Sequence, residues 1–202
     1  MQYSPVENLM NCFAGMTGKE VPQAEKDVWS TLCSLKVIPA RRCLLQQDDM
    51  AKECYYIVKG LCRQYYIDDS GADVTRGFIS EGGFCCTEAL FESDRSRYSI
   101  ETLEECHMLV FRPRDVEAKL KDSMYMHQVY IAALVLNIRN RIRRENMFLT
   151  CSAVERYQQF LKSYPELRNR IKQVHLATYL GINQVTLSRV RRAMRESGNK
   201  DV

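Results

Sequence analysis

The stretch from Lys36 to Arg112 constrains the fold most, because short apolar runs alternate there with turn signals. Its five clearest runs are rich in β-branched and aromatic residues and cover residues 54–59, 61–67, 74–80, 98–103 and 107–112. Gly60, the segment Asp68 to Asp73 and the segment Glu81 to Gly83 punctuate them. Strands this short at this regular spacing predict an antiparallel sandwich or barrel rather than βαβ units.

Helical patterns flank this stretch. On the N-terminal side Pro22 suits the first turn of a helix. Apolar residues follow it at helical spacing, at Val28, Trp29, Leu32 and Leu35. We therefore predict one N-terminal helix that begins near Pro22 and continues through Leu35.

After Arg112 the pattern is helical to the end of the chain, and one apolar stripe dominates its first part. The stripe consists of Met124, Ile131, Leu134, Ile138, Ile142 and Leu149. A helix this long needs a partner for its stripe, and an identical helix is the simplest one. We predict a homodimer whose two-fold seam lies near Ile131, Leu134, Ile138 and Ile142. Packing of the stripe against the chain's own β domain, or a mixture of both, is the alternative.

Composition and charge indicate where the protein works and what it binds. No stretch of about eighteen apolar residues is present, and the first residues do not resemble a secretory signal, so we expect a cytoplasmic protein without a membrane partner. The nine cysteines are scattered and odd in number, which favours reduced thiols over a disulfide framework. From Cys151 onward 10 Lys and Arg residues face 4 Asp and Glu, whereas the preceding part has 19 against 21. This surplus predicts a polyanionic partner for the C-terminal part, with a solvated basic face as the alternative.

Ser152-Ala-Val-Glu155 has the spacing of a capping box, so a helix should start near Ser152 and end before Pro165.

The next segment, residues 173–192, has the pattern of a helix-turn-helix. Leu176, Ala177 and Leu180 would form the inner face of its first helix, which Gly181 can end in a left-handed conformation. Ile182 would fill the corner and Asn183 would cap the second helix. Val185 or Thr186, with Leu187 and Val190, would then point inward. An ordinary helical hairpin is the alternative.

The second helix would contact double-stranded DNA through Gln184, Val185, Thr186, Ser188, Arg189 and Arg192. Among them, Arg189 has the planar fork that pairs with both acceptors of guanine, so we expect it to read a base. Gln184 and Ser188 would assist Arg189 in recognising the base, and Val185 could contact a thymine methyl group. Thr186 and Arg192 would hold phosphates.

The chain resembles the Crp/Fnr (cyclic-AMP receptor protein) superfamily of bacterial transcription regulators over nearly its whole length. The matching pieces are Tyr55-Tyr-Ile-Val-Lys-Gly60, the Asp68-to-Gly71 hairpin, Gly82-Gly-Phe84, Glu88, Leu90-Phe91, Tyr98-Ser-Ile100, Leu176-Ala-Thr-Tyr-Leu-Gly-Ile182 and Thr186-Leu-Ser-Arg189. The resemblance implies an α+β protein with three units. These are a β-roll sensor domain with an N-terminal helix (1–121), a long dimerisation helix (122–149) and a helix-turn-helix domain (150–202). The short C-terminus predicts no wing after the recognition helix. RNA polymerase is a candidate partner.

We predict that cyclic AMP is not the effector. In cyclic-nucleotide binders of this family, a Gly-Glu-Leu segment and an Arg-Ser/Thr pair hold the cyclic phosphate and ribose. Here Thr87-Glu88-Ala89 replaces the first element. The second element is displaced, because Ser96-Arg97-Tyr98 stands where Arg followed by Ser would be expected. A one-residue shift along a strand would send Arg97 to the opposite face. The candidate effector residues are Glu88, Ser96, Arg97, Tyr98, Ser99 and Arg141. They would serve an unidentified small molecule, or the pocket would be empty or filled by its own side chains.

Other chemistries are disfavoured by what the sequence lacks. Iron–sulfur relatives carry a tight N-terminal cysteine cluster, but only Cys12 precedes the β domain, so no such cluster is expected. The adjacent Cys85 and Cys86 should point to opposite faces of a strand, and buried inert thiols are favoured over a redox role. A cupin-type metalloenzyme would need converging histidines, whereas the three histidines fall on a strand, the long helix and the helix-turn-helix. We therefore predict no enzyme, metal or cofactor. A β-roll sensor acting through protein partners is the remaining alternative.

Overall fold

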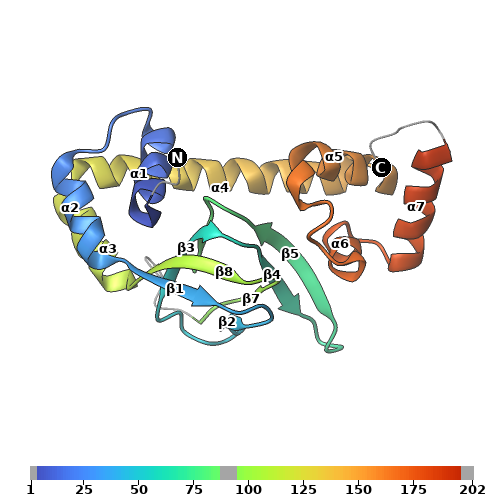
Figure 1. Cartoon of the computed structure of the whole chain (residues 1–202). Coiled ribbons are helices and arrows are strands. Elements are labelled where there is room, and N and C mark those ends of the chain that lie inside the picture. The colour runs from blue at the N-terminus through green and yellow to red at the C-terminus, as the bar shows by residue number, and fades with distance from the viewer. Residues whose placement is uncertain (1–3, 87–94, 197–202) are drawn as a thin grey trace.

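An antiparallel β-roll lies beside one long helix, and further helices cover both ends of that helix (Figure 1). The computed structural model describes residues 4–86 and 95–196 of the 202-residue chain. Two four-stranded sheets form the roll, in the orders β1-β8-β3-β6 and β2-β7-β4-β5, and all neighbouring strands are antiparallel. The predicted α+β class, with a β-roll, a long helix and a small helical C-terminal unit, is confirmed.

The strands of the roll follow the apolar runs of the sequence. They are β1 Ser34–Ile38, β2 Cys43–Leu45, β3 Cys54–Lys59, β4 Cys62–Ile67, β5 Asp73–Ile79, β6 Phe84–Cys85, β7 Ser99–Thr102 and β8 Cys106–Phe111. The five predicted runs correspond to β3, β4, β5, β7 and β8, with ends that differ by one residue at most. Strands β1, β2 and β6 were not predicted individually, because β1 is largely exposed and the other two are very short.

The helices are α1 Pro5–Thr17, α2 Gln23–Leu32, α3 Pro113–Asp122, α4 Met124–Thr150, α5 Ala153–Ser163, α6 Gln173–Tyr179 and α7 Gln184–Glu196. The predicted continuation of the N-terminal helix through Leu35 is wrong: α2 ends at Leu32, and Leu35 pairs with Leu109 in the sheet. Helix α1 was not predicted, although Ser4 and Glu7 form a capping box at its start. The predicted capping box of Ser152 and Glu155 is confirmed at the start of α5.

Aromatic packing fixes the N-terminal helices to one end of the roll. Trp29 of α2 is buried. The centre of its ring lies 5.2 Å from the ring centre of Phe13 in α1 and 5.4 Å from the ring centre of Phe111 in β8. Inside the roll, Cys85 and Cys86 belong to the same buried cluster. The expectation that they point to opposite faces is wrong, because β6 ends at Cys85 and Cys86 has a left-handed φ of 64°.

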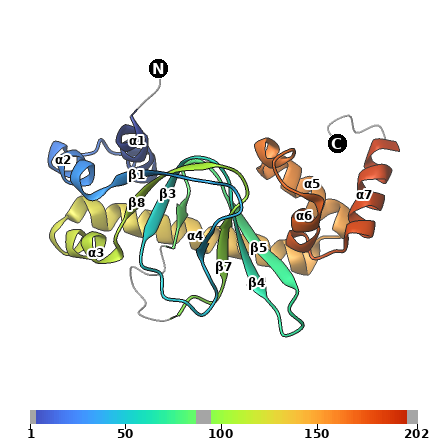
Figure 2. The same ribbon diagram turned by 60° about the horizontal axis from the view of Figure 1, so that its bottom comes forward.

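The C-terminal unit packs directly on the β-roll, on the side of β4 and β5 (Figure 2). Leu61 of the roll is buried in one cluster with Phe160 of α5 and Leu176 of α6, and Phe78 of β5 packs against that cluster. Helix α4 runs past both units and connects them along its length (Figure 1). The contact between roll and C-terminal unit therefore links the two places where function is expected. The described residues of the C-terminal unit contain no strand.

Candidate DNA-binding surface and effector cavity

Helices α6 and α7 form a helix-turn-helix whose turn has the predicted geometry. Gly181 has a left-handed φ of 67°, and an added Cβ there would lie 2.7 Å from the Phe148 ring. Asn183 caps α7, since its Oδ1 accepts a hydrogen bond of 2.8 Å from the backbone N–H of Thr186. The predicted roles of Gly181 and Asn183 are confirmed, and both are local: a turn and a cap.

Helix α7 has one buried face and one exposed face. Leu187 and Val190 are buried together with Leu176, Ala177 and Leu180 of α6. Of the two inward candidates, Thr186 is half-buried whereas Val185 is 61% exposed. The other residues predicted to contact DNA, Gln184, Ser188, Arg189 and Arg192, are exposed. Arg192 donates a hydrogen bond of 2.7 Å to Glu196, so DNA would have to compete with this local ion pair.

The apolar stripe of α4 is largely exposed in the part of the chain that the structure describes. Ile131, Leu134, Ile138 and Ile142 are 57%, 41%, 54% and 59% exposed. At about 100° per residue, the buried Val129 and Met147 lie on the opposite side of the helix from Ile138. The alternative in which the stripe packs against the chain's own β domain is therefore wrong, because the helix uses its other face for that contact.

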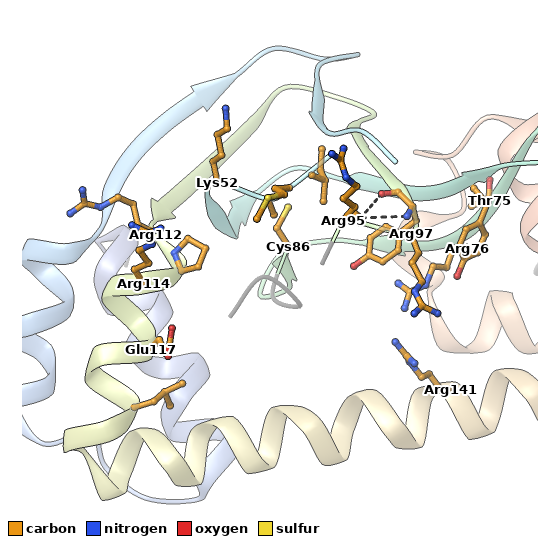
Figure 3. Close-up of a pocket in the computed structure, with 18 of the residues that line it drawn as sticks. Lys52, Thr75, Arg76, Cys86, Arg95, Arg97, Arg112, Arg114, Glu117 and Arg141 are labelled. Carbon is orange, nitrogen blue, oxygen red and sulfur yellow. Dashed lines mark hydrogen bonds between the residues drawn. The ribbon is translucent and has the colours of Figure 1, made fainter. Parts of the chain in front are cut away.

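An open cavity of 1770 Å³ lies between the β-roll, α3 and α4 (Figure 3). Four of the predicted effector residues line it: Ser96, Arg97, Tyr98 and Arg141. Ser99 does not, because it is buried and its Oγ accepts a hydrogen bond of 2.9 Å from the backbone of Gln47. Glu88, like Thr87, Ala89, Leu90 and Phe91, lies outside the described residues.

The strand argument about Arg97 is wrong. Strand β7 begins at Ser99, so the segment Ser96 to Tyr98 precedes it and has no alternating faces. Ser96 instead forms a tight turn in which its Oγ donates a hydrogen bond of 2.7 Å to the carbonyl of Tyr98. The turn leaves the Arg97 side chain at the cavity.

Two further arginines of this cavity were not predicted. Arg76 of β5 donates a hydrogen bond of 2.6 Å to Gln64, and its guanidinium lies 4.4 Å from the centre of the Tyr98 ring. Arg144 of α4 also lines the cavity, between the rings of Phe148 and Tyr179. The helical spacing of Arg141 and Arg144 could have indicated the second, whereas only the folded roll brings Arg76 to the same place.

A buried arginine joins the roll to the helix-turn-helix. Arg63 of β4 is only 2% exposed, and its guanidinium makes two bonds of 2.9 Å to Asp73 and one of 2.8 Å to Glu101. Its Nη1 also lies 2.7 Å from Nδ1 of His175 in α6, which fits a neutral, accepting imidazole. Burial, and after it the charge of Arg63, lower the pKa of His175 below its usual value of 6.5.

A second ion pair and a hydroxyl pair complete this junction. Arg170, which precedes α6, lies 2.8 Å from Glu81 and 2.5 Å from Glu104 of the roll. Hydrogen bonds to Glu81 and then to Glu104 raise the pKa of Arg170. Thr178 of α6 donates a hydrogen bond of 2.8 Å to the hydroxyl of the buried Thr75 in β5. The position of the helix-turn-helix is thus fixed by polar contacts to the roll, none of which the sequence alone indicated.

The described residues contain no group of three or more His, Cys, Asp or Glu side chains placed to hold a metal ion. The histidines lie where the sequence placed them: His107 on β8, His127 on α4 and His175 on α6. No helix in the described part of the chain has the length and apolarity that a bilayer span requires.

The sequence and the fold of this chain resemble those of known proteins. Residues 35–123 match the family described as "Cyclic nucleotide-binding domain". No curated protein matches the sequence.

Several solved structures resemble most of the chain. CLP from Xanthomonas campestris, a c-di-GMP responsive global regulator, is 15% identical, with 88% of this chain and 93% of CLP covered and a TM-score of 0.71. FixK2 from Bradyrhizobium japonicum is 16% identical, with 82% and 86% covered and a TM-score of 0.72. A putative Crp/Fnr-family regulator from Eubacterium rectale is 14% identical, with 88% and 85% covered and a TM-score of 0.68. The predicted resemblance to the Crp/Fnr superfamily is confirmed, and at these identities it establishes the fold.

Proposed function

We propose that this protein is a sequence-specific DNA-binding transcription regulator that works as a homodimer. The observation that carries the proposal is α7, which is capped and buried on one side and presents Gln184, Val185, Ser188 and Arg189 on the other. These four residues lie in the first two turns of the helix, the part that enters the major groove in helix-turn-helix proteins. The basic surplus after Cys151 supplies the attraction to the DNA backbone.

The dimer is the second part of the proposal. Two copies of α4 would cover each other's exposed stripe and place two copies of α7 about a two-fold axis. Symmetric half-sites in DNA require such an axis, and their spacing follows from the distance between the two recognition helices. The β-roll would sense a signal, and the junction at Arg63, Arg170 and Thr178 would transmit it to the helix-turn-helix.

Selection of binding sites from random or genomic DNA with the purified full chain tests the function directly. Fluorescence anisotropy then compares the selected operator with random duplex. Arg189→Ala should cost about 1–3 kcal/mol on the operator and relax the preference at one base pair per half-site. Arg192→Ala should weaken binding to both DNAs alike and reduce the salt slope by about one. Equal losses for Arg189→Ala on both DNAs would make it a phosphate contact, and no selected site at all would refute the function.

We also propose that cyclic AMP is not the effector. The described cavity presents arginines from β5, from the turn before β7 and from α4, and the chain has Thr87 in place of the glycine of cyclic-nucleotide binders. Calorimetry that shows micromolar cyclic-AMP binding, lost in Arg97→Ala, would refute this part of the proposal alone.

A further inference from the structure

Helix α6 rests on the β4–β5 side of the roll through one connected polar network (Figure 2). Arg63 of β4, only 2% exposed, pairs with the carboxylates of Asp73 in β5 and Glu101 in β7. Its Nη1 also lies 2.7 Å from Nδ1 of His175 in α6 and 3.3 Å from the hydroxyl of Thr75 in β5. The buried guanidinium therefore joins three strands of one sheet to the first helix of the helix-turn-helix.

The contact between Arg63 and His175 depends on the protonation state of the imidazole. A guanidinium is always charged and only donates hydrogen bonds, so Nδ1 of His175 must accept. A protonated imidazole carries a hydrogen on both ring nitrogens and has no lone pair to offer Arg63. At 2.7 Å it would also bring two positive charges into direct contact, one of them on a buried side chain. The contact therefore exists only while the imidazole is neutral.

The described residues place charged groups of both signs around this imidazole. Arg63 on β4 and Lys172, just before α6, oppose a further positive charge, whereas Glu101 on β7 and Asp73 on β5 favour one. Burial, and after it the charge of Arg63, outweigh the two carboxylates and lower the pKa of His175 below its usual value of 6.5. Hydrogen bonds from Arg63 lower the pKa of Asp73, so this carboxylate stays charged near pH 6.

The seat of α6 on the roll also positions the recognition helix α7. Thr178, one turn after His175, donates a hydrogen bond of 2.8 Å to the hydroxyl of Thr75. Leu176 of α6 and Leu187 of α7 are buried in the same cluster, so the two helices move together. The outer face of α7 is exposed in this arrangement. A helix-turn-helix held in this way is therefore accessible to DNA.

We propose that Arg63 is a positioning residue for DNA binding, which acts through neutral His175, and that protonation of His175 weakens operator binding by displacing the helix-turn-helix. A two-fold operator requires both copies of α7 at one fixed separation at the same time. The network at Arg63 supplies this separation, because it holds each helix-turn-helix to its own roll. The proposal rests on the regulator function given above and adds a proton-controlled contact to it.

The expected pH effect is opposite in sign to that of ordinary electrostatics. Acidification adds positive charge to a protein, which by itself strengthens the attraction to the DNA backbone. Displacement of α6 weakens binding instead, and it does so only on sites that engage both half-sites. An imidazole released from Arg63 has the usual pKa of about 6.5 and is about tenfold more protonated than neutral at pH 5.5. Acidification from pH 7.5 to 5.5 therefore weakens the network by up to about tenfold in each protomer.

Fluorescence anisotropy of the full-length protein on the selected operator and on random duplex tests the pH effect at pH 7.5, 6.5 and 5.5. Salt is held at about 0.1 M throughout. We expect operator affinity to fall about fivefold or more over this range, while affinity for random duplex stays level or rises. Operators with one or two base pairs inserted between the half-sites should lose less affinity at pH 5.5 than at pH 7.5. Partial unfolding would lower the active fraction and leave this spacing preference unchanged.

Four variants identify the groups responsible. His175→Asn keeps a neutral acceptor near the position of Nδ1, so it should bind the operator like the wild type at pH 7.5 and lose the pH effect. Arg63→Gln should bind the operator about fivefold more weakly at pH 7.5 and show little further loss at pH 5.5. Arg170→Gln breaks another ion pair between roll and C-terminal unit and should keep the pH effect. His107→Gln removes a histidine of the other sheet and should match the wild type.

Three results would overturn the proposal: operator affinity that stays level or rises on acidification, an unchanged pH effect in His175→Asn, or an equal loss of the effect in His107→Gln. Failure to select any operator at pH 7.5 refutes the regulator function and this proposal with it. A selected operator whose affinity does not depend on pH leaves the regulator function standing and overturns the role of Arg63 and His175 alone.

Discussion

Replacing Leu134 and Ile138 by lysine should split the proposed dimer. Both residues lie in the exposed stripe of α4, where a second copy would bury them. Burying a whole leucine or isoleucine side chain contributes about 1.5–3 kcal/mol. Because 41% of Leu134 and 54% of Ile138 are exposed, each would contribute about half of that, or about 1 kcal/mol.

A two-fold dimer contains each residue twice, so the double variant removes about 4 kcal/mol of burial. This corresponds to a roughly thousandfold weaker dimer, before the repulsion between four new ammonium groups is counted. Sedimentation equilibrium over a concentration series measures the dissociation constant directly. The stripe is not needed for the monomer's own core, so far-UV circular dichroism should be unchanged.

The matched control introduces the same two lysines on the other side of the helix, as Leu136→Lys with Asn140→Lys. Both of these residues are exposed and lie about 160° around the helix from Ile138. The control should leave the dissociation constant within a few-fold of the wild type. An unchanged dimer in the Leu134 and Ile138 variant, or equal weakening in the control, would refute the reasoning that places the seam on this stripe.

Three further predictions concern the roll and its junction. Arg63→Met should lower the free energy of unfolding by about 3 kcal/mol in urea, since it leaves two carboxylates unpaired, and adding Asp73→Asn should restore part of it. The lowered pKa of His175 means that the unfolded state takes up a proton at a higher pH than the folded state does. The free energy of unfolding of the wild type should therefore be level above about pH 7.5 and fall as the pH drops through 6.5. A His175→Gln variant with the same fall would contradict this. Gly60→Ala should cost about 2–4 kcal/mol, because φ is 118° and its Cβ would meet the Cys106 backbone at 2.8 Å, whereas Gly15→Ala in α1, with open space around it, should be neutral or stabilising by thermal melting.

The sequence by itself determined the features that depend on neighbours along the chain. The strand pattern of residues 54–112 predicted an antiparallel sandwich or barrel, because side-chain alternation and turn residues are local properties. The left-handed Gly181, the cap at Asn183 and the capping box at Ser152 were equally readable. The same signal is present at Ser4 and Glu7, where it marks the start of α1.

Tertiary structure decided everything that depends on segments far apart in the sequence. Leu35 has the spacing of the preceding helix, yet it pairs with Leu109 because an edge position beside β8 satisfies its backbone groups. Arg63 and His175 are separated by 112 residues and meet only because α6 packs on β4 and β5. The gathering of Arg76, Arg97 and Arg141 at one cavity has the same origin, since charge and spacing along a chain do not reveal which side chains converge. Local chemistry thus specified the elements, and packing between them specified the sites.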